Sequence, residues 1–134
     1  MRRTLIICII IVIAIILWDI MLQRYVKQVF EPINYMLDEI ANKLDEENEI
    51  NNKEELKNKM GEVDNLWDSK FKKMACFLEH DELEKVKTQF VVVKSAIEVN
   101  DRENAYEEIN KAKYIIDHIK QKVNFSINNI MWIL

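Results

Sequence analysis

The chain has 134 residues, of which 49% are hydrophobic and 31% are charged, and its net charge is −4. One Gly and one Pro are too few for the turns of a sheet protein, so we expect an all-α fold. From residue 31 onward, 15 Lys and Arg stand against 22 Asp and Glu. The resulting net charge of −7 argues against nucleic-acid binding and against broad adhesion to anionic lipid.

The N-terminal residues form an apolar segment of membrane-spanning length. Residues 4–22 make about 28 Å of helix, close to the roughly 30 Å hydrocarbon core of a bilayer. No Ala, Gly or Ser stands in residues 19–25, so a signal peptidase has no small-residue cleavage site there. Cys8 follows Ile7, where lipoprotein processing needs a small residue. The sequence therefore predicts an uncleaved transmembrane helix over residues 5–22.

Asp19 lies near the exit of this helix, beside Trp18. Trp is favoured at the membrane–water interface, so one interpretation is that both side chains mark the level of the lipid headgroups. The other is that Asp19 pairs with a basic group of a partner membrane protein, because ionised side chains within a span are costly and commonly paired. We favour the first and leave the second open.

The charges that flank the apolar segment favour one orientation. The basic residues are Arg2 and Arg3 before it and Arg24 and Lys27 after it, the second pair being offset by Asp19 and Glu31. The positive-inside rule places the more basic flank in the cytoplasm. We therefore predict a single-pass protein of the cell membrane, with a cytoplasmic tail (1–4), a transmembrane helix (5–22) and an extracytoplasmic helical domain (23–134).

Apolar residues recur at steps of three and four along the rest of the chain, which is the period of amphipathic helices. The stripes are Leu22, Val26, Val29, Ile33, Leu37, Ile40 and Leu44; Leu56, Met60, Val63, Trp67, Phe71, Met74 and Leu78; Leu83, Val86, Phe90, Val93 and Ile97; and Ala105, Ile109, Ala112, Ile116 and Ile119. These residues are the predicted core. They imply a small bundle of about four helices.

The breaks between the stripes predict how the helices are joined. Pro32 falls within the first stripe and predicts a kink or break near Glu31. A polar loop over 45–53, a junction at His80-Asp81 and a turn at Asn100-Asp101 separate the remaining helices. Asp81 has the chemistry to cap the helix that follows it. The result is two antiparallel hairpins, over residues 33–79 and 82–122.

The C-terminal residues predict one more short helix. Ser126 is a candidate cap, and the apolar residues on one side of the helix are Ile127, Ile130, Met131 and Leu134. This segment either folds back over the two hairpins or enters the membrane interface, where Trp132 is favoured. We favour folding back, because no basic residue follows Lys122.

The pattern resembles a bacterial family of unknown function, domain-of-unknown-function family 4363. The resemblance is carried by Trp67, His80-Asp81-Glu82-Leu83-Glu84, Ala96-Ile97, Asn100-Asp101, Ala105, Ile115-Ile116-Asp117-His118-Ile119 and Ile127-Asn128-Asn129-Ile130. It covers roughly residues 60–130, and the first hairpin only in outline. It implies a short, N-terminally anchored envelope protein of Gram-positive spore-forming bacteria, with a multi-pass membrane protein as partner. It implies no activity.

The residues that could carry chemistry do not form a known site. His80 lacks the second His one turn away that a zinc helix needs, and Asp117 beside His118 points elsewhere on a helix. We interpret both His residues as helix-end residues that meet free carbonyls. Cys76 has no activating basic group nearby, which favours a buried thiol. The sequence therefore predicts no enzyme, metal or cofactor.

Two binding functions follow from this architecture. The first is an anchored helical interaction module that docks on a membrane or envelope partner; the alternative is an extracytoplasmic small-ligand sensor acting through a partner membrane protein. The stripes offer few polar groups to a ligand, which favours the first. Trp67 is interpreted as core rather than as a binding platform, and Lys70, Lys72 and Lys73 as a solvated face. The candidate interaction residues are Asp19, Trp67, His80 and Trp132.

Overall fold

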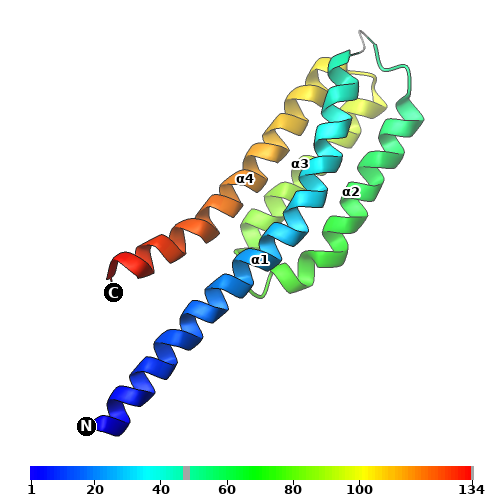
Figure 1. The fold of residues 1–134 in the computed structure, drawn as a ribbon. Helices are drawn as coiled ribbons and strands as arrows, with labels where there is room; N and C mark the ends of the chain where they lie inside the picture. The colour runs from blue at the N-terminus through cyan, green and yellow to red at the C-terminus, as the bar shows by residue number, and fades with distance from the viewer. Residues whose placement is uncertain (47–48, 134) are drawn as a thin grey trace.

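The computed structural model describes the backbone of residues 1–46 and 49–133, and side chains as far as residue 124. The elements are α1 (Arg2–Glu46), α2 (Lys53–Met74), α3 (His80–Glu98) and α4 (Arg102–Ile133). The described residues contain no strand. The four helices run up and down in chain order (Figure 1). The predicted all-α bundle is confirmed, and the loop expected over 45–53 falls between α1 and α2.

The helices pack as a square. Within the described residues, α1 contacts α2 and α4, α3 contacts the same two helices, and the diagonal pairs do not meet. The two predicted hairpins therefore lie side by side. The N-terminal half of α1 projects beyond the bundle at the end where the loop 75–79 lies (Figure 1). We call this the proximal end, and the end with the turn 99–101 the distal end.

The predicted stripes form one continuous core. Every stripe residue is buried except Leu22, Phe71 and Leu78, which are half-buried and pack against the core. The core also includes Phe30, Ala41 and Ala96, which the stripes did not predict. Trp67 occupies its centre. Its indole stacks on Phe30 at 5.8 Å between ring centroids and meets Phe90 edge-on at 5.7 Å.

Helix α1 continues through Pro32 without interruption, so the break expected near Glu31 is wrong. Pro32 is exposed, whereas Phe30 and Ile33 beside it are fully buried. The packing of these neighbours offsets the one backbone hydrogen bond that proline removes. The predicted transmembrane segment and the first helix of the bundle are therefore a single element.

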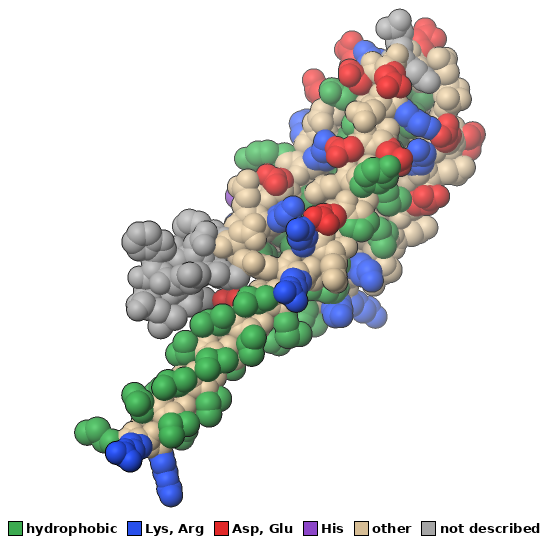
Figure 2. Space-filling model, in the orientation of Figure 1, with side chains coloured by type: hydrophobic (Ala, Val, Ile, Leu, Met, Phe, Trp, Pro, Cys, Tyr) green, Lys and Arg blue, Asp and Glu red, His purple; other side chains and the backbone are tan. Residues whose placement is uncertain are grey.

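Among the described residues, α1 is the one helix long and apolar enough to cross a membrane by length and composition. Its most apolar window has a mean hydropathy of 3.2, and none of that window is buried in the structure. In Figure 2 this part of α1 is an almost continuous apolar surface with basic side chains at its tip. An apolar helix at this place fits a membrane anchor or a signal sequence.

The turn between α3 and α4 confirms the prediction at Asn100-Asp101. Asn100 adopts a φ of 57°, and its N–H donates to the carbonyl of Ile97 at 3.1 Å. The N–H of Asp101 donates to the carbonyl of Ala96 at 3.0 Å, which completes a Schellman motif. The Asp101 carboxylate then accepts from the Asn104 N–H at 3.1 Å and caps α4.

Two other predicted boundaries differ from the structure. Helix α3 begins at His80, so Asp81 lies in its first turn, where the helix dipole favours a carboxylate, rather than at the cap. Helix α4 runs unbroken to Ile133, so the short C-terminal helix expected from Ser126 is not a separate element. The side chains that were expected to pack there, Ile127, Ile130, Met131, Trp132 and Leu134, lie outside the described residues.

Candidate functional site

An aromatic cluster joins the apolar part of α1 to the bundle at the proximal end. The Phe77 ring, in the loop between α2 and α3, meets Trp18 at 5.5 Å and Tyr25 at 6.2 Å between centroids, edge-on in both cases. Trp18 and Tyr25 are two helical turns apart and share one face of α1. Phe77 therefore spans both turns and fixes the loop against α1.

A small hollow lies within this cluster. Its volume is about 120 Å³ and its walls are Trp18, Met21, Leu22, Tyr25, Lys73 and Phe77. We call it the proximal hollow. It is smaller than the roughly 300–1,000 Å³ of a pocket that encloses a small molecule. Its walls are almost wholly apolar: the Tyr25 side chain lines it, but the Tyr25 hydroxyl is buried, and the Lys73 ammonium lies over the Tyr25 ring.

These two polar groups lack ordinary partners. The Tyr25 hydroxyl is buried and forms no hydrogen bond with the described residues. Burial raises the pKa of this phenol above its ordinary value, and the charge on Cys76 adds to the effect. Lys73 Nζ lies 4.6 Å from the centroid of the Tyr25 ring, within cation–π range. The hollow thus combines apolar walls with one cation, whereas the unused Tyr25 donor is buried.

Five lysines have no carboxylate partner among the described residues, and one of them, Lys73, lines the hollow. Most lysines of the bundle form ion pairs. The described residues give no carboxylate partner to Lys70, Lys72, Lys73, Lys85 and Lys120, which all lie in the proximal half. The first three form the proximal lysine cluster at the end of α2. Figure 2 shows basic side chains where the apolar segment meets the bundle and acidic ones toward the distal end.

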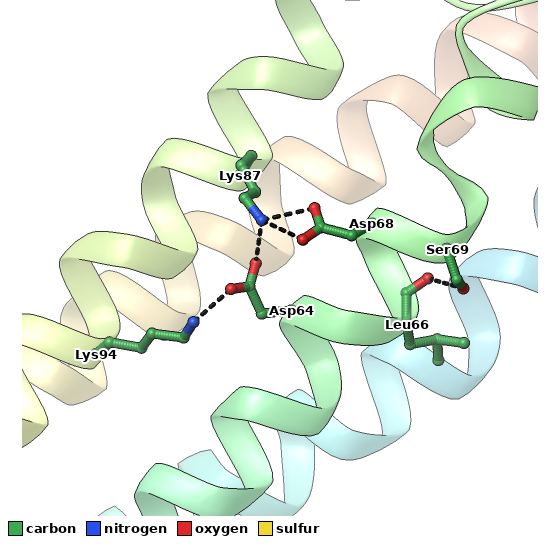
Figure 3. A network of polar contacts seen from close by, with 6 residues as sticks. All are labelled: Asp64, Leu66, Asp68, Ser69, Lys87 and Lys94. Atoms are coloured by element: carbon green, nitrogen blue, oxygen red, sulfur yellow. Dashed lines mark hydrogen bonds and ion pairs between the residues drawn. The ribbon is translucent and has the colours of Figure 1, made fainter.

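A set of ion pairs fixes the end of α2 to α3 (Figure 3). Lys87 Nζ lies 2.6 Å from the Asp68 carboxylate and 2.9 Å from Asp64 Oδ1, and Lys94 binds Oδ2 of Asp64. Burial alone would raise the pKa of Asp64, but Lys94 and Lys87 outweigh it and hold the pKa below its ordinary value. The helix that carries the proximal lysine cluster is therefore held by charge as well as by the core.

Asp19 lines a second groove, on the other side of the loop 75–79. The groove also contains Glu79, Glu82 and Lys122, and Lys122 Nζ lies 2.5 Å from Glu82 Oε1. Asp19 is half-buried there. The structure thus places Lys122, a basic residue of the same chain, in the groove that Asp19 lines. This adds an intramolecular neighbour to the two interpretations of Asp19, which were the lipid headgroups and a basic group of a partner protein.

The other candidate residues have different surroundings. Trp67 has no exposed surface, so it is a core residue. His80 is exposed at the first residue of α3, with Nε2 3.6 Å from Glu84 Oε1. His118 lies within α4 and stacks on Tyr114 at 6.5 Å, so neither His meets free carbonyls at a helix end as expected. The described residues contain no His, Cys, Asp and Glu group that could hold a metal.

The structure also corrects the prediction for Cys76 and adds Tyr25 and Phe77 to the residues of the candidate site. Cys76 is exposed rather than buried, because α2 ends at Met74 and Cys76 lies in the loop that follows it. Tyr25 and Phe77 were not singled out from the sequence. Tyr25 could have been found as an aromatic residue two turns beyond Trp18, whereas the approach of Phe77 depends on how α2 packs.

Comparison with known families agrees with this architecture. The family described as a domain of unknown function, DUF4363, matches residues 20–130. The chain belongs to this family. The match confirms the resemblance read from the sequence, and it covers the whole bundle together with Tyr25 and Phe77. No significant match was found among the curated proteins or the solved structures.

Proposed function

We propose that this chain is a membrane-anchored helical interaction module of the bacterial envelope, which acts by docking on a partner membrane or envelope protein rather than by catalysis. The observation that carries the proposal is the continuity of α1. Its first half exposes apolar side chains, and its second half supplies core residues from Val26 to Leu44. One rigid helix therefore sets the position of the bundle relative to the membrane.

The exposed part of α1 supports retention as an anchor. Its exposed apolar residues include Leu5, Ile6, Ile7, Ile9, Ile10, Ile11, Ile13, Ile15, Ile16 and Leu17. A soluble monomer rarely exposes so continuous an apolar surface. The junction also supports retention, because Leu22 and Tyr25 already pack against the core of the bundle. Cleavage near residue 22 would cut within a helix that the fold uses.

The orientation that we propose has the N-terminus in the cytoplasm and the bundle outside. Arg2 and Arg3 support it through the positive-inside rule. The proximal lysine cluster does not count against it, because the rule applies within about 15–20 residues of a span along the chain. Lys70, Lys72 and Lys73 are far beyond that distance in sequence and reach the span only in the folded protein.

The orientation is tested with the exposed thiol of Cys76. In intact cells that carry Cys8→Ser, a maleimide that cannot cross the membrane should label Cys76 from outside. Labelling only after lysis would reverse the proposed orientation. Carbonate washing of the same membranes should leave the chain in the pellet, and its release would contradict the anchor.

The partner is tested by photocrosslinking. Exposed aromatic residues are frequent in protein interfaces, and Tyr35 on α1 and Tyr114 on α4 are 66% and 73% exposed. A benzophenone amino acid at either position should give an adduct with one membrane protein in living cells. The same amino acid at Tyr106, which packs against the core, is the matched control. Absence of adducts from both exposed positions, or the same adducts from Tyr106, would contradict docking through these faces.

A further inference from the structure

We propose that the proximal hollow binds an anionic phospholipid of the membrane that α1 spans. The lipid phosphate would lie against Lys73, and the start of an acyl chain would lie against Trp18, the Tyr25 ring and Phe77. This inference rests on the proposed anchoring of α1. It identifies a ligand class for a site that the sequence alone treated as part of a solvated face.

The position of the hollow fits the boundary between lipid tails and headgroups. Trp18 ends the uncharged part of α1, where a Trp side chain is favoured at the interface. Tyr25 lies seven residues further along the helix, about 10 Å at 1.5 Å per residue. The headgroup layer on each side of a bilayer is roughly 5–8 Å thick. The hollow therefore extends from the edge of the hydrocarbon through the headgroups.

The chemistry of the hollow selects for an anion with an apolar tail. Lys73 is the one charged residue of its walls, which contain no carboxylate. Lys73 has no carboxylate partner among the described residues, although its ammonium faces the Tyr25 ring. A phosphate diester supplies acceptors and negative charge to this ammonium, and its acyl chains match the apolar walls.

The charged residues around the hollow also bear on its preference for an anion. Lys70 and Lys72 have no carboxylate partner among the described residues and extend the positive surface beside Lys73. The groove of Asp19, Glu79 and Glu82 shares Leu22 and Phe77 with the hollow, and Lys122 offsets part of its negative charge by pairing with Glu82. The acidic groups of the distal end are about 30 Å away along the helices, well beyond a Debye length of about 10 Å. The net charge of −7 over residues 31–134 thus argues against broad adhesion but permits a local lipid site.

The test compares lipid retention by the full chain in detergent micelles, measured by native mass spectrometry. Phosphatidylglycerol and phosphatidylcholine with identical acyl chains are added at equal concentration. The double variant Lys70→Gln/Lys73→Gln removes the charge of Lys73 from the hollow and that of Lys70 from the surface beside it. It is compared with Lys85→Gln/Lys120→Gln, which removes the same charge from lysines that also lack carboxylate partners but lie outside both the hollow and the proximal lysine cluster. Tyr25→Phe, which removes only the buried hydroxyl, is a second control. Circular dichroism establishes that each variant keeps the helical bundle.

The wild-type chain is expected to retain phosphatidylglycerol in preference to phosphatidylcholine. Lys70→Gln/Lys73→Gln should lower the affinity for phosphatidylglycerol about thirtyfold, from about fivefold for each basic group, whereas Tyr25→Phe should change it by less than about twofold, because the hydroxyl is buried. The control double variant should stay within about twofold of the wild type. Equal retention of the two lipids, or an equal loss in both double variants, would overturn the proposal. Release of the chain from membranes by carbonate would instead overturn the anchor on which it rests.

Discussion

Trp67 shows how one residue organises this bundle. It comes from α2 and touches Phe30 of α1 and Phe90 of α3, so it joins three of the four helices at the centre of the core. Its indole Nε1 is buried and has no hydrogen-bond partner among the described residues. Packing alone therefore holds the Trp67 side chain in place, and a substitution at this position removes that packing.

We predict that Trp67→Ala destabilises the bundle by about 3–5 kcal/mol, as is usual when a large aromatic side chain is removed from a core. In a domain of this size the melting temperature should fall by more than about 10 °C, measured by circular dichroism of the full chain in micelles. Tyr114→Ala is the control, because Tyr114 is largely exposed. A fall of only a few degrees for Trp67→Ala would place the centre of the core elsewhere.

The Asp64 carboxylate should make the stability of the bundle depend on pH. Its pKa is held below the ordinary value of 3.8, so the carboxylate contributes stability above that pH and loses it as pH falls through the lower folded-state pKa. Asp64→Asn should therefore cost about 1–2 kcal/mol at pH 7, and less at pH 3. Asp68→Asn should cost less than about 1 kcal/mol at pH 7, because the Asp68 side chain is 52% exposed. Melting temperatures that show the same cost for Asp64→Asn at both pH values would contradict this account.

At the level of elements, α1 carries an internal proline that its packing tolerates. Replacing Pro32 with Ala restores a backbone donor on the exposed side of the helix, and we predict a gain of about 1–3 kcal/mol in the free energy of unfolding. Gln28→Ala, at another exposed position of α1, should change it by less than about 0.5 kcal/mol. A lower melting temperature for Pro32→Ala would show instead that the bundle needs the local shape that proline imposes.

The helices and their core were predictable from the sequence because local physics decides them. Burial follows the 3.6-residue period, and the turn at Asn100-Asp101 follows from residues that tolerate a positive φ and cap a helix. The continuity at Pro32 was not predictable, because it depends on the packing of Phe30 and Ile33. The candidate site was found only in part, since Lys73 and Phe77 meet Tyr25 across some fifty residues of chain.

For the whole molecule, the consequence is that the apolar segment and the bundle form one body. Because α1 passes from the apolar segment into the core without a break, the proposed anchoring would hold the proximal end at the membrane surface. Helices of about twenty residues then place the distal end roughly 30 Å above it. Partner proteins would meet the sides and the distal end of the bundle, while lipid would meet the loop 75–79.

The most direct test is a measurement of depth. A nitroxide on Cys76 of the full chain carrying Cys8→Ser, reconstituted in phosphatidylcholine–phosphatidylglycerol vesicles, reports its collisions with oxygen and with a water-soluble nickel chelate. The control label is at Val99→Cys in a chain that also carries Cys76→Ser, because Val99 is 72% exposed at the distal turn. The proposed anchoring predicts that the label on Cys76 lies at the headgroups, with less access to nickel and more to oxygen than the label at position 99. Equal access at the two positions would contradict a bundle held on the membrane by a continuous α1.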